Sequence, residues 1–215
     1  MNKSIYSLVL SDEVIEAIDR MAYSMNTSRS ALINQILAEA VSYVTPEKRM
    51  RDIFGRMEEI LLSDNAFQLM MQSSDSMFSV RSALAYKYNP TIKYSLELNK
   101  EIDKEIGKLK ISLRTQNRTL ILYLAEFFKL LATLEEKYLG MSGICITDGK
   151  FTKILKRRSE EALNEERLAV EISDYINLID NCIKMYFANL EYKEETAQKI
   201  ERMYLQYLKN HSIVA

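Results

Sequence analysis

Hydrophobic and polar residues alternate near the start of the chain and then recur at helical spacing. The alternation over Ile5–Leu10 predicts a short strand, because successive side chains of a strand point to opposite faces. A helical pattern follows, with Ser11 as its N-cap and its end near Met25. A second helical pattern begins after Ser28, which suits a second N-cap. The pattern therefore predicts one strand and two helices in the first 45 residues.

A third helix is expected over residues 46–63. Thr45 suits an N-cap, and Pro46 suits the first helical position, where the missing backbone N–H would have no helical partner anyway. Residues 64–89 are harder to interpret, since most of them show neither the helical nor the strand period. Residues 67–72 are compatible with a strand, and the rest of this stretch stays undecided.

The second half of the chain shows both periods. Strict alternation over residues 91–115 predicts an antiparallel β-hairpin, and the amphipathic pattern over residues 117–139 predicts a helix that covers its apolar face. Residues 157–210 contain neither Pro nor Gly and repeat at steps of three and four, which predicts long helix. The charged stretch 191–195 is compatible with a turn between two helices.

These elements predict an α+β fold that is predominantly helical. We expect four regions, namely an N-terminal module at 1–45, a linking helix at 46–63, a small α+β domain at 64–140 and a C-terminal helical region at 150–210. A chain of 215 residues is long enough to bury such cores without disulfide or metal staples.

Composition and motifs exclude several classes of function. No apolar run approaches the ~20 residues of a membrane span, and the N-terminus lacks the features of a secretory signal, so a cytoplasmic protein with no membrane partner is expected. Cys145 and Cys182 match no metal-ligand or redox spacing. The only histidine, His211, lies near the C-terminus, and neither a nucleophile elbow nor a phosphate-binding glycine loop occurs. We therefore expect no enzyme, no cofactor and no metal site.

The order of elements in the first 45 residues resembles the ribbon-helix-helix family, which includes the Arc, methionine and CopG-type repressors. The resemblance rests on Leu8–Glu13 at the strand end and helix start, on Ile18–Tyr23 in the first helix, and on Asn26–Ile33 at the start of the second. It covers about a fifth of the chain.

The resemblance implies a homodimer in which two strands pair as an antiparallel ribbon over four intertwined helices. The ribbon would enter the major groove of DNA, and the N-terminus of the second helix would bind phosphate. The residues placed toward the bases are Lys3, Ile5, Ser7 and Val9, and those placed at phosphate are Thr27, Ser28 and Arg29.

Charge gives DNA binding little general support. The chain has a formal net charge of −1, and residues 1–45 carry three Lys or Arg against five Asp or Glu, a local charge of −2. On the base-facing side only Ser7 can hydrogen-bond a base, whereas Ile5 and Val9 can contact thymine methyl groups. We therefore expect modest sequence readout.

Two basic features outside the module could extend a DNA footprint or form ordinary solvated surfaces. They are the polar face of the hairpin, with Lys93, Lys108, Lys110 and Arg114, and the run of Lys150, Lys153, Lys156, Arg157 and Arg158. A solvated surface is the favoured interpretation, because Glu97 interrupts the first feature and Glu160 and Glu161 follow the second.

The sequence thus predicts a sequence-specific DNA-binding transcriptional regulator that acts as a ribbon-helix-helix homodimer, prokaryotic by its resemblance. Its C-terminal region is expected to bind a protein or small-molecule effector or to set a higher oligomer. Two alternatives stay open. One is a non-catalytic protein-interaction scaffold that uses the module only to dimerise, and the other is a plasmid-maintenance or antitoxin-type factor.

Overall fold

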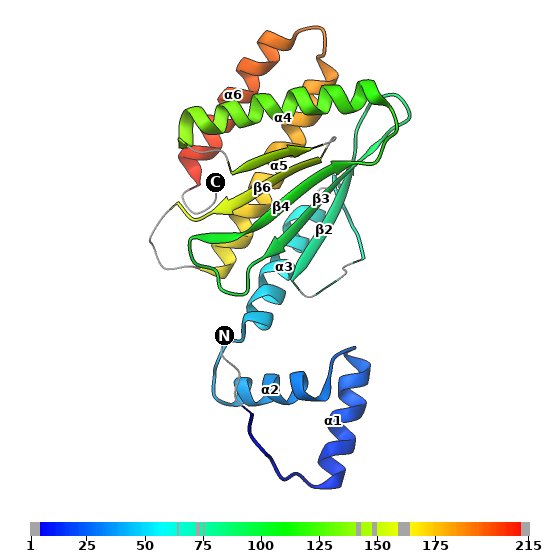
Figure 1. Ribbon diagram of the computed structural model, residues 1–215, viewed down its shortest axis with the longest axis vertical. Coiled ribbons are helices and arrows are strands. Elements are labelled where there is room, and N and C mark those ends of the chain that lie inside the picture. The colour runs from blue at the N-terminus through cyan, green and yellow to red at the C-terminus, as the bar shows by residue number, and fades with distance from the viewer. Residues whose placement is uncertain are drawn as a thin grey trace. The chain divides into compact units, whose positions relative to one another are not determined.

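The computed structural model describes residues 5–63, 65–71, 74, 76–140, 143–147, 150–158 and 164–211. These residues form six α-helices and six β-strands, so the fold combines helix and sheet as predicted, with helix the larger share (Figure 1). The chain divides into two compact units, Met1–Thr45 and Pro46–Ala215.

The first unit is built on two helices, α1 (Asp12–Ser24) and α2 (Arg29–Ala40). They begin directly after the predicted N-cap residues, Ser11 and Ser28. The two helices predicted from the pattern of hydrophobic residues are therefore confirmed.

The strand predicted at Ile5–Leu10 is not formed in the single chain. These residues belong to no helix or strand, and they pair with no strand among the described residues. A strand needs a neighbour for its backbone N–H and C=O groups, and the predicted ribbon takes that neighbour from a second copy. One chain by itself therefore leaves the segment exposed.

The second unit contains a six-stranded antiparallel sheet with the order β1-β2-β3-β4-β6-β5. Its strands are β1 (Gln68–Leu69), β2 (Met77–Ala83), β3 (Thr91–Leu98), β4 (Glu105–Leu113), β5 (Ile144–Thr147) and β6 (Lys150–Lys156). The predicted hairpin is confirmed, since β3 and β4 pair from Ile92 opposite Leu113 to Leu98 opposite Gly107.

Four helices complete the second unit: α3 (Pro46–Leu62), α4 (Arg118–Leu139), α5 (Glu165–Ala188) and α6 (Lys193–Asn210). The helices predicted at 46–63 and 117–139 are confirmed. The long helical pattern near the C-terminus is divided by a turn at residues 189–192, close to the charged stretch that suggested one.

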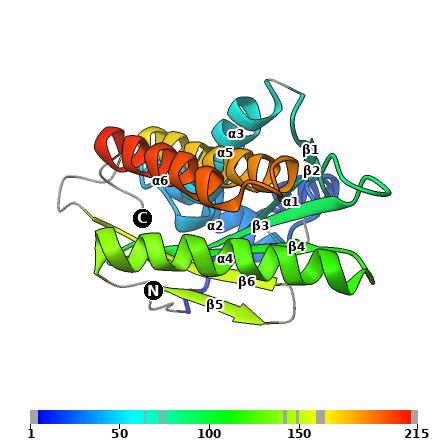
Figure 2. The ribbon, with the colours of Figure 1, turned by 90° about the horizontal axis from the view of Figure 1, so that it is seen from above.

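One hydrophobic core joins these helices to the sheet. Phe54 of α3 stacks on Phe78 of β2, with ring centroids 5.7 Å apart, and Phe128 of α4 stacks on Phe151 of β6 at 4.4 Å. Seen from above in Figure 2, α4 lies across β4 and β6, and α3, α5 and α6 are grouped beside it. The helices therefore pack on one face of the sheet and leave the other open.

The prediction of a helical region from residue 150 onward is wrong for residues 150–156, which form β6. The sequence pattern does not indicate this strand, because the polar residue Lys153 points into the core between Phe151 and Leu155 and breaks the alternation of apolar and polar residues. β2 was missed for a similar reason, since the polar Ser82 lies on its buried face. The structure joins residues 46–215 in one unit, where the sequence suggested three successive regions.

Candidate nucleic-acid interface

The turn between α1 and α2 sets where the second helix begins. α1 ends in a Schellman motif, in which the Thr27 N–H donates to the Ala22 carbonyl at 2.9 Å and the Asn26 N–H donates to the Tyr23 carbonyl at 3.1 Å. Asn26 takes the left-handed conformation, with a φ of 51°, which Asn adopts more readily than most residues. This local arrangement starts α2 at Arg29.

Two of the predicted phosphate-binding residues already bond within the chain. The Thr27 N–H is used by the turn, and the Ser28 hydroxyl accepts a hydrogen bond from the Ala31 N–H at 3.2 Å as the N-cap of α2. The first-turn N–H groups of Arg29 and Ser30 have no carbonyl one turn earlier in the helix. A phosphate at this helix end would therefore meet those two N–H groups.

The Arg29 guanidinium is held by Asp19 of α1. Its Nε donates to Oδ1 of Asp19 at 2.6 Å, and a second nitrogen bonds Oδ2, so the pair is bidentate. These hydrogen bonds are the main reason that the pKa of Arg29 is raised and the pKa of Asp19 is lowered. The two side chains are 54% and 45% exposed, so the pair adds little to stability and can open toward a phosphate. No sequence pattern signals this pairing across the turn.

The predicted base-facing residues lie in the exposed segment before α1. Ile5 and Val9 are fully exposed, Ser7 is exposed, and Lys3 lies outside the described residues. Leu8, which the alternation assigns to the opposite face, is also 59% exposed. The single chain therefore covers neither face of the segment.

Exposed hydrophobic side chains are concentrated in the first unit. Nineteen large hydrophobic residues are exposed among the described residues, and fourteen of them lie in Met1–Thr45. The described hydrophobic residues that are buried in this unit are Ala22, Leu32 and Ala38. So small a core cannot offset the conformational entropy that folding costs. The first unit by itself therefore leaves most of its large hydrophobic side chains uncovered.

The second unit offers a different chemical feature, a buried charge pair. Lys153 of β6 donates to Glu135 of α4, and the side chains are 2% and 0% exposed. The Tyr175 hydroxyl of α5 donates to the same carboxylate oxygen at 2.7 Å, and the Lys153 ammonium lies 4.7 Å from the Tyr175 ring centroid. These contacts connect β6, α4 and α5 inside the core, so the role of the pair is structural.

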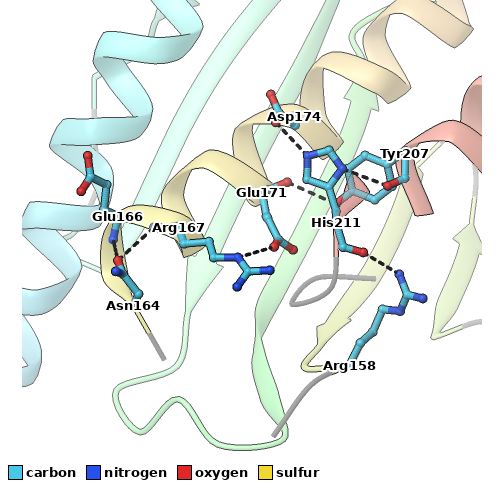
Figure 3. Close-up of polar contacts among 8 residues, drawn as sticks. All are labelled: Arg158, Asn164, Glu166, Arg167, Glu171, Asp174, Tyr207 and His211. Carbon is cyan, nitrogen blue, oxygen red and sulfur yellow. Dashed lines mark hydrogen bonds and ion pairs between the residues drawn. The ribbon is translucent and has the colours of Figure 1, made fainter. Parts of the chain in front are cut away.

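Figure 3 shows a second polar cluster, where α5 meets the end of α6. Nε2 of His211 lies 2.9 Å from Oδ2 of Asp174, and Nδ1 lies 2.9 Å from the Tyr207 carbonyl oxygen. The His211 ring stacks on the Tyr207 ring with centroids 4.2 Å apart, and Arg158 donates to the His211 carbonyl. These contacts fasten the end of α6 to α5 and to the segment after β6.

A surface hollow of about 420 Å³ lies between α3 and the start of α5. It is lined by Asp52, Arg56, Asn164, Glu165 and Glu166. Ligand pockets are mostly lined by apolar residues, whereas all five residues of this lining are polar or charged. No group of three or more His, Cys, Asp or Glu among the described residues could hold a metal ion. Within the same described ranges, no helix has the length and apolar character to cross a membrane.

Comparisons with protein-family models, with curated proteins and with solved structures found no match. The candidate interface therefore rests on the residues and geometry of the first unit.

Proposed function

We propose that this protein is a homodimeric, sequence-specific DNA-binding transcriptional regulator whose first unit is a ribbon-helix-helix module. The observation that carries the proposal is the exposed apolar segment Ile5–Leu10 ahead of two helices that bury almost no core of their own. A second copy of the same unit supplies both the missing strand and the missing core.

The apolar area is large enough to drive this association. If a second copy covers half of the fourteen exposed side chains, at roughly 1.5 kcal/mol each, the gain is about 10 kcal/mol per chain. Association itself costs about 4–15 kcal/mol for the two chains together. A dimer held by residues of this unit is therefore favourable.

Ribbon formation sorts the alternating side chains of the segment. Leu8 and Leu10 turn toward the helices, and Ile5, Ser7 and Val9 turn toward the major groove. Ser7 then hydrogen-bonds a base edge, and the two apolar residues contact thymine methyl groups. At the start of α2 the N–H groups and Arg29 contact phosphate, once Arg29 exchanges Asp19 for the DNA.

Two neighbouring substitutions test the two faces of the ribbon. Leu8→Asp places a charge in the dimer core, so this variant should sediment as a monomer, whereas the wild type should sediment as a dimer of 25.0 kDa chains. Val9→Asp adds the same charge on the opposite face, so the variant should stay dimeric and lose its preference for the selected DNA. Binding is measured against duplexes selected from a randomised library, at several salt concentrations.

The matched pair separates the possible failures. If Leu8→Asp stays dimeric, or if Val9→Asp binds selected DNA as tightly as the wild type, the ribbon assignment is wrong. If the wild type selects no duplex at low salt, DNA binding itself is refuted.

A second candidate is a non-catalytic protein-interaction scaffold that uses the first unit only to dimerise. The local charge of −2 and the placement of Asp19 beside the start of α2 favour it, because both repel phosphate. A dimeric wild type that binds no DNA, and that captures a stoichiometric protein partner from lysate, is the outcome expected of the scaffold.

A further inference from the structure

The open face of the sheet in the second unit gathers cations that are far apart in the sequence. In one cross-strand row, Arg81 of β2 pairs with Lys93 of β3, which pairs with Ser112 of β4, which pairs with Lys150 of β6. Lys110 and Lys108 of β4 lie in the next two rows of the same face, opposite Ser95 and Glu97 of β3. These five side chains, which we call the basic sheet face, are all exposed.

The basic sheet face differs from an ordinary solvated surface in its balance of charge. Among the described residues of these three rows, Glu97 is the one carboxylate, and it pairs with Lys110 at 3.4 Å. At the end of the face, Lys156 lies opposite Glu105 and adds no net charge. The whole chain carries 29 cationic and 30 acidic residues, so five cations against one acid is a marked segregation.

The strand register also brings two of these cations together. Arg81 and Lys93 lie directly opposite each other on neighbouring antiparallel strands. Like charges in this position destabilise a sheet. Arg81 moderates the cost by donating to Gln68 of β1 at 3.1 Å, but the two cations remain adjacent. An anionic partner turns this unfavourable pair into a favourable one.

We propose that the basic sheet face binds the phosphate backbone of duplex DNA, as a sequence-independent contact beside the readout by the first unit. The five cations span three strand spacings in one direction and four residues in the other, about 14 Å each way. Duplex DNA carries about eight phosphates over that length, roughly four per strand. The number of cations therefore matches the phosphates that one side of a duplex presents.

The chemistry of the face favours a duplex over a single strand. Single-stranded nucleic acid is bound on aromatic side chains that stack with exposed bases. No Phe, Tyr or Trp occupies an outward position in the described rows of this face, whose other members are Gln68, Glu97 and residues of the types Ser, Thr, Met, Cys and Ile. Cations without stacking partners contact phosphate and leave paired bases alone.

The test uses the full chain and a generic duplex of about 30 base pairs, with affinity measured by fluorescence anisotropy from 50 to 200 mM salt. The sheet variant is Lys93→Gln, Lys108→Gln and Lys110→Gln together. The matched control replaces three exposed helix lysines by Gln, at Lys129, Lys199 and Lys209. Three lost phosphate contacts should lower the slope of log K against log salt by about 2.7 and weaken binding roughly 100-fold or more.

The control should bind as the wild type does. The inference is overturned if the sheet variant keeps the wild-type slope and affinity, or if the control loses as much as the sheet variant. It is also overturned if the sheet variant loses only binding to single-stranded DNA or RNA, since the face would then serve another nucleic acid.

The inference rests on the proposed function in one respect, that the ligand is duplex DNA, and the Val9→Asp variant separates the two. Generic binding that survives Val9→Asp and falls when the sheet substitutions are added supports the sheet face whatever the ribbon does. Loss of selectivity in Val9→Asp with no effect of the sheet substitutions refutes the sheet face and leaves the proposed function standing.

Discussion

Removing one member of the buried pair Lys153–Glu135 should destabilise the second unit strongly. Lys153→Met deletes the ammonium and leaves the Glu135 carboxylate fully buried, with the Tyr175 hydroxyl as its hydrogen-bond donor and its second oxygen without a partner among the described residues. Stranding a buried charge in this way costs about 3–5 kcal/mol of unfolding free energy.

Removing both charges should restore most of the loss. In Lys153→Met/Glu135→Leu no charge is stranded, and the remaining cost is the Tyr175 hydroxyl without an acceptor, about 1–3 kcal/mol. The double variant should therefore be more stable than Lys153→Met, and the double-mutant cycle should give a coupling of at least about 3 kcal/mol.

The Glu135→Leu single variant has a characteristic pH dependence. Burial lowers the pKa of Lys153 from its ordinary value, and its attraction to Glu135 opposes that shift. Without Glu135 the folded protein releases this proton more easily than the unfolded chain, which then binds more protons. The unfolding free energy of this variant should therefore rise relative to wild type as the pH rises from neutral toward 10.

Urea unfolding at a fixed protein concentration, followed by circular dichroism and tyrosine fluorescence, measures these differences. Lys137→Met serves as a control, since Lys137 forms an exposed pair with Glu201 and its loss should change stability little. Single variants that lose less than about 1 kcal/mol, or a coupling near zero, would refute the idea that the charges are confined in a dry core.

Three further predictions concern pH and local structure. Burial raises the pKa of Tyr94 and Tyr175 well above 10.0 and raises the pKa of Cys182 to about 12. The unfolded chain therefore releases these protons first, so stability should be complete below pH 9 and decline above it, as urea midpoints at increasing pH will show; a flat profile up to pH 11 contradicts this. Asn117→Ala removes the N-cap side chain that accepts from two N–H groups of α4, so the unfolding free energy measured in urea should fall by about 1 kcal/mol. An unchanged unfolding free energy would show that this cap does not stabilise the helix. Ser42 follows the C-cap of α2 with a φ of 56°, so Ser42→Gly should raise the thermal midpoint of the protein by an amount worth up to about 1 kcal/mol; a lower midpoint would show that this turn is not strained.

The helix boundaries of this protein could be predicted from sequence because local chemistry decides them. Ser28 was identifiable as a cap because a short polar side chain can satisfy the N–H groups that a helix start leaves free. The hairpin of β3 and β4 was equally clear, since one strand face is buried and the other solvated, which requires strict alternation. The choice of proposed base-facing residues rests on the same alternation, extended by a family resemblance.

Only the tertiary structure decided which distant residues become neighbours. Lys153 can lie on the buried face of β6 because Glu135 of α4 lies beside it. A lysine is tolerated in a core only with such a partner. Arg29 meets Asp19 through the turn between two helices. Sheet order likewise sets lysines of β3, β4 and β6 side by side on one face. Local patterns report whether a residue is buried, whereas the pairing of charges depends on three-dimensional proximity that no local pattern contains.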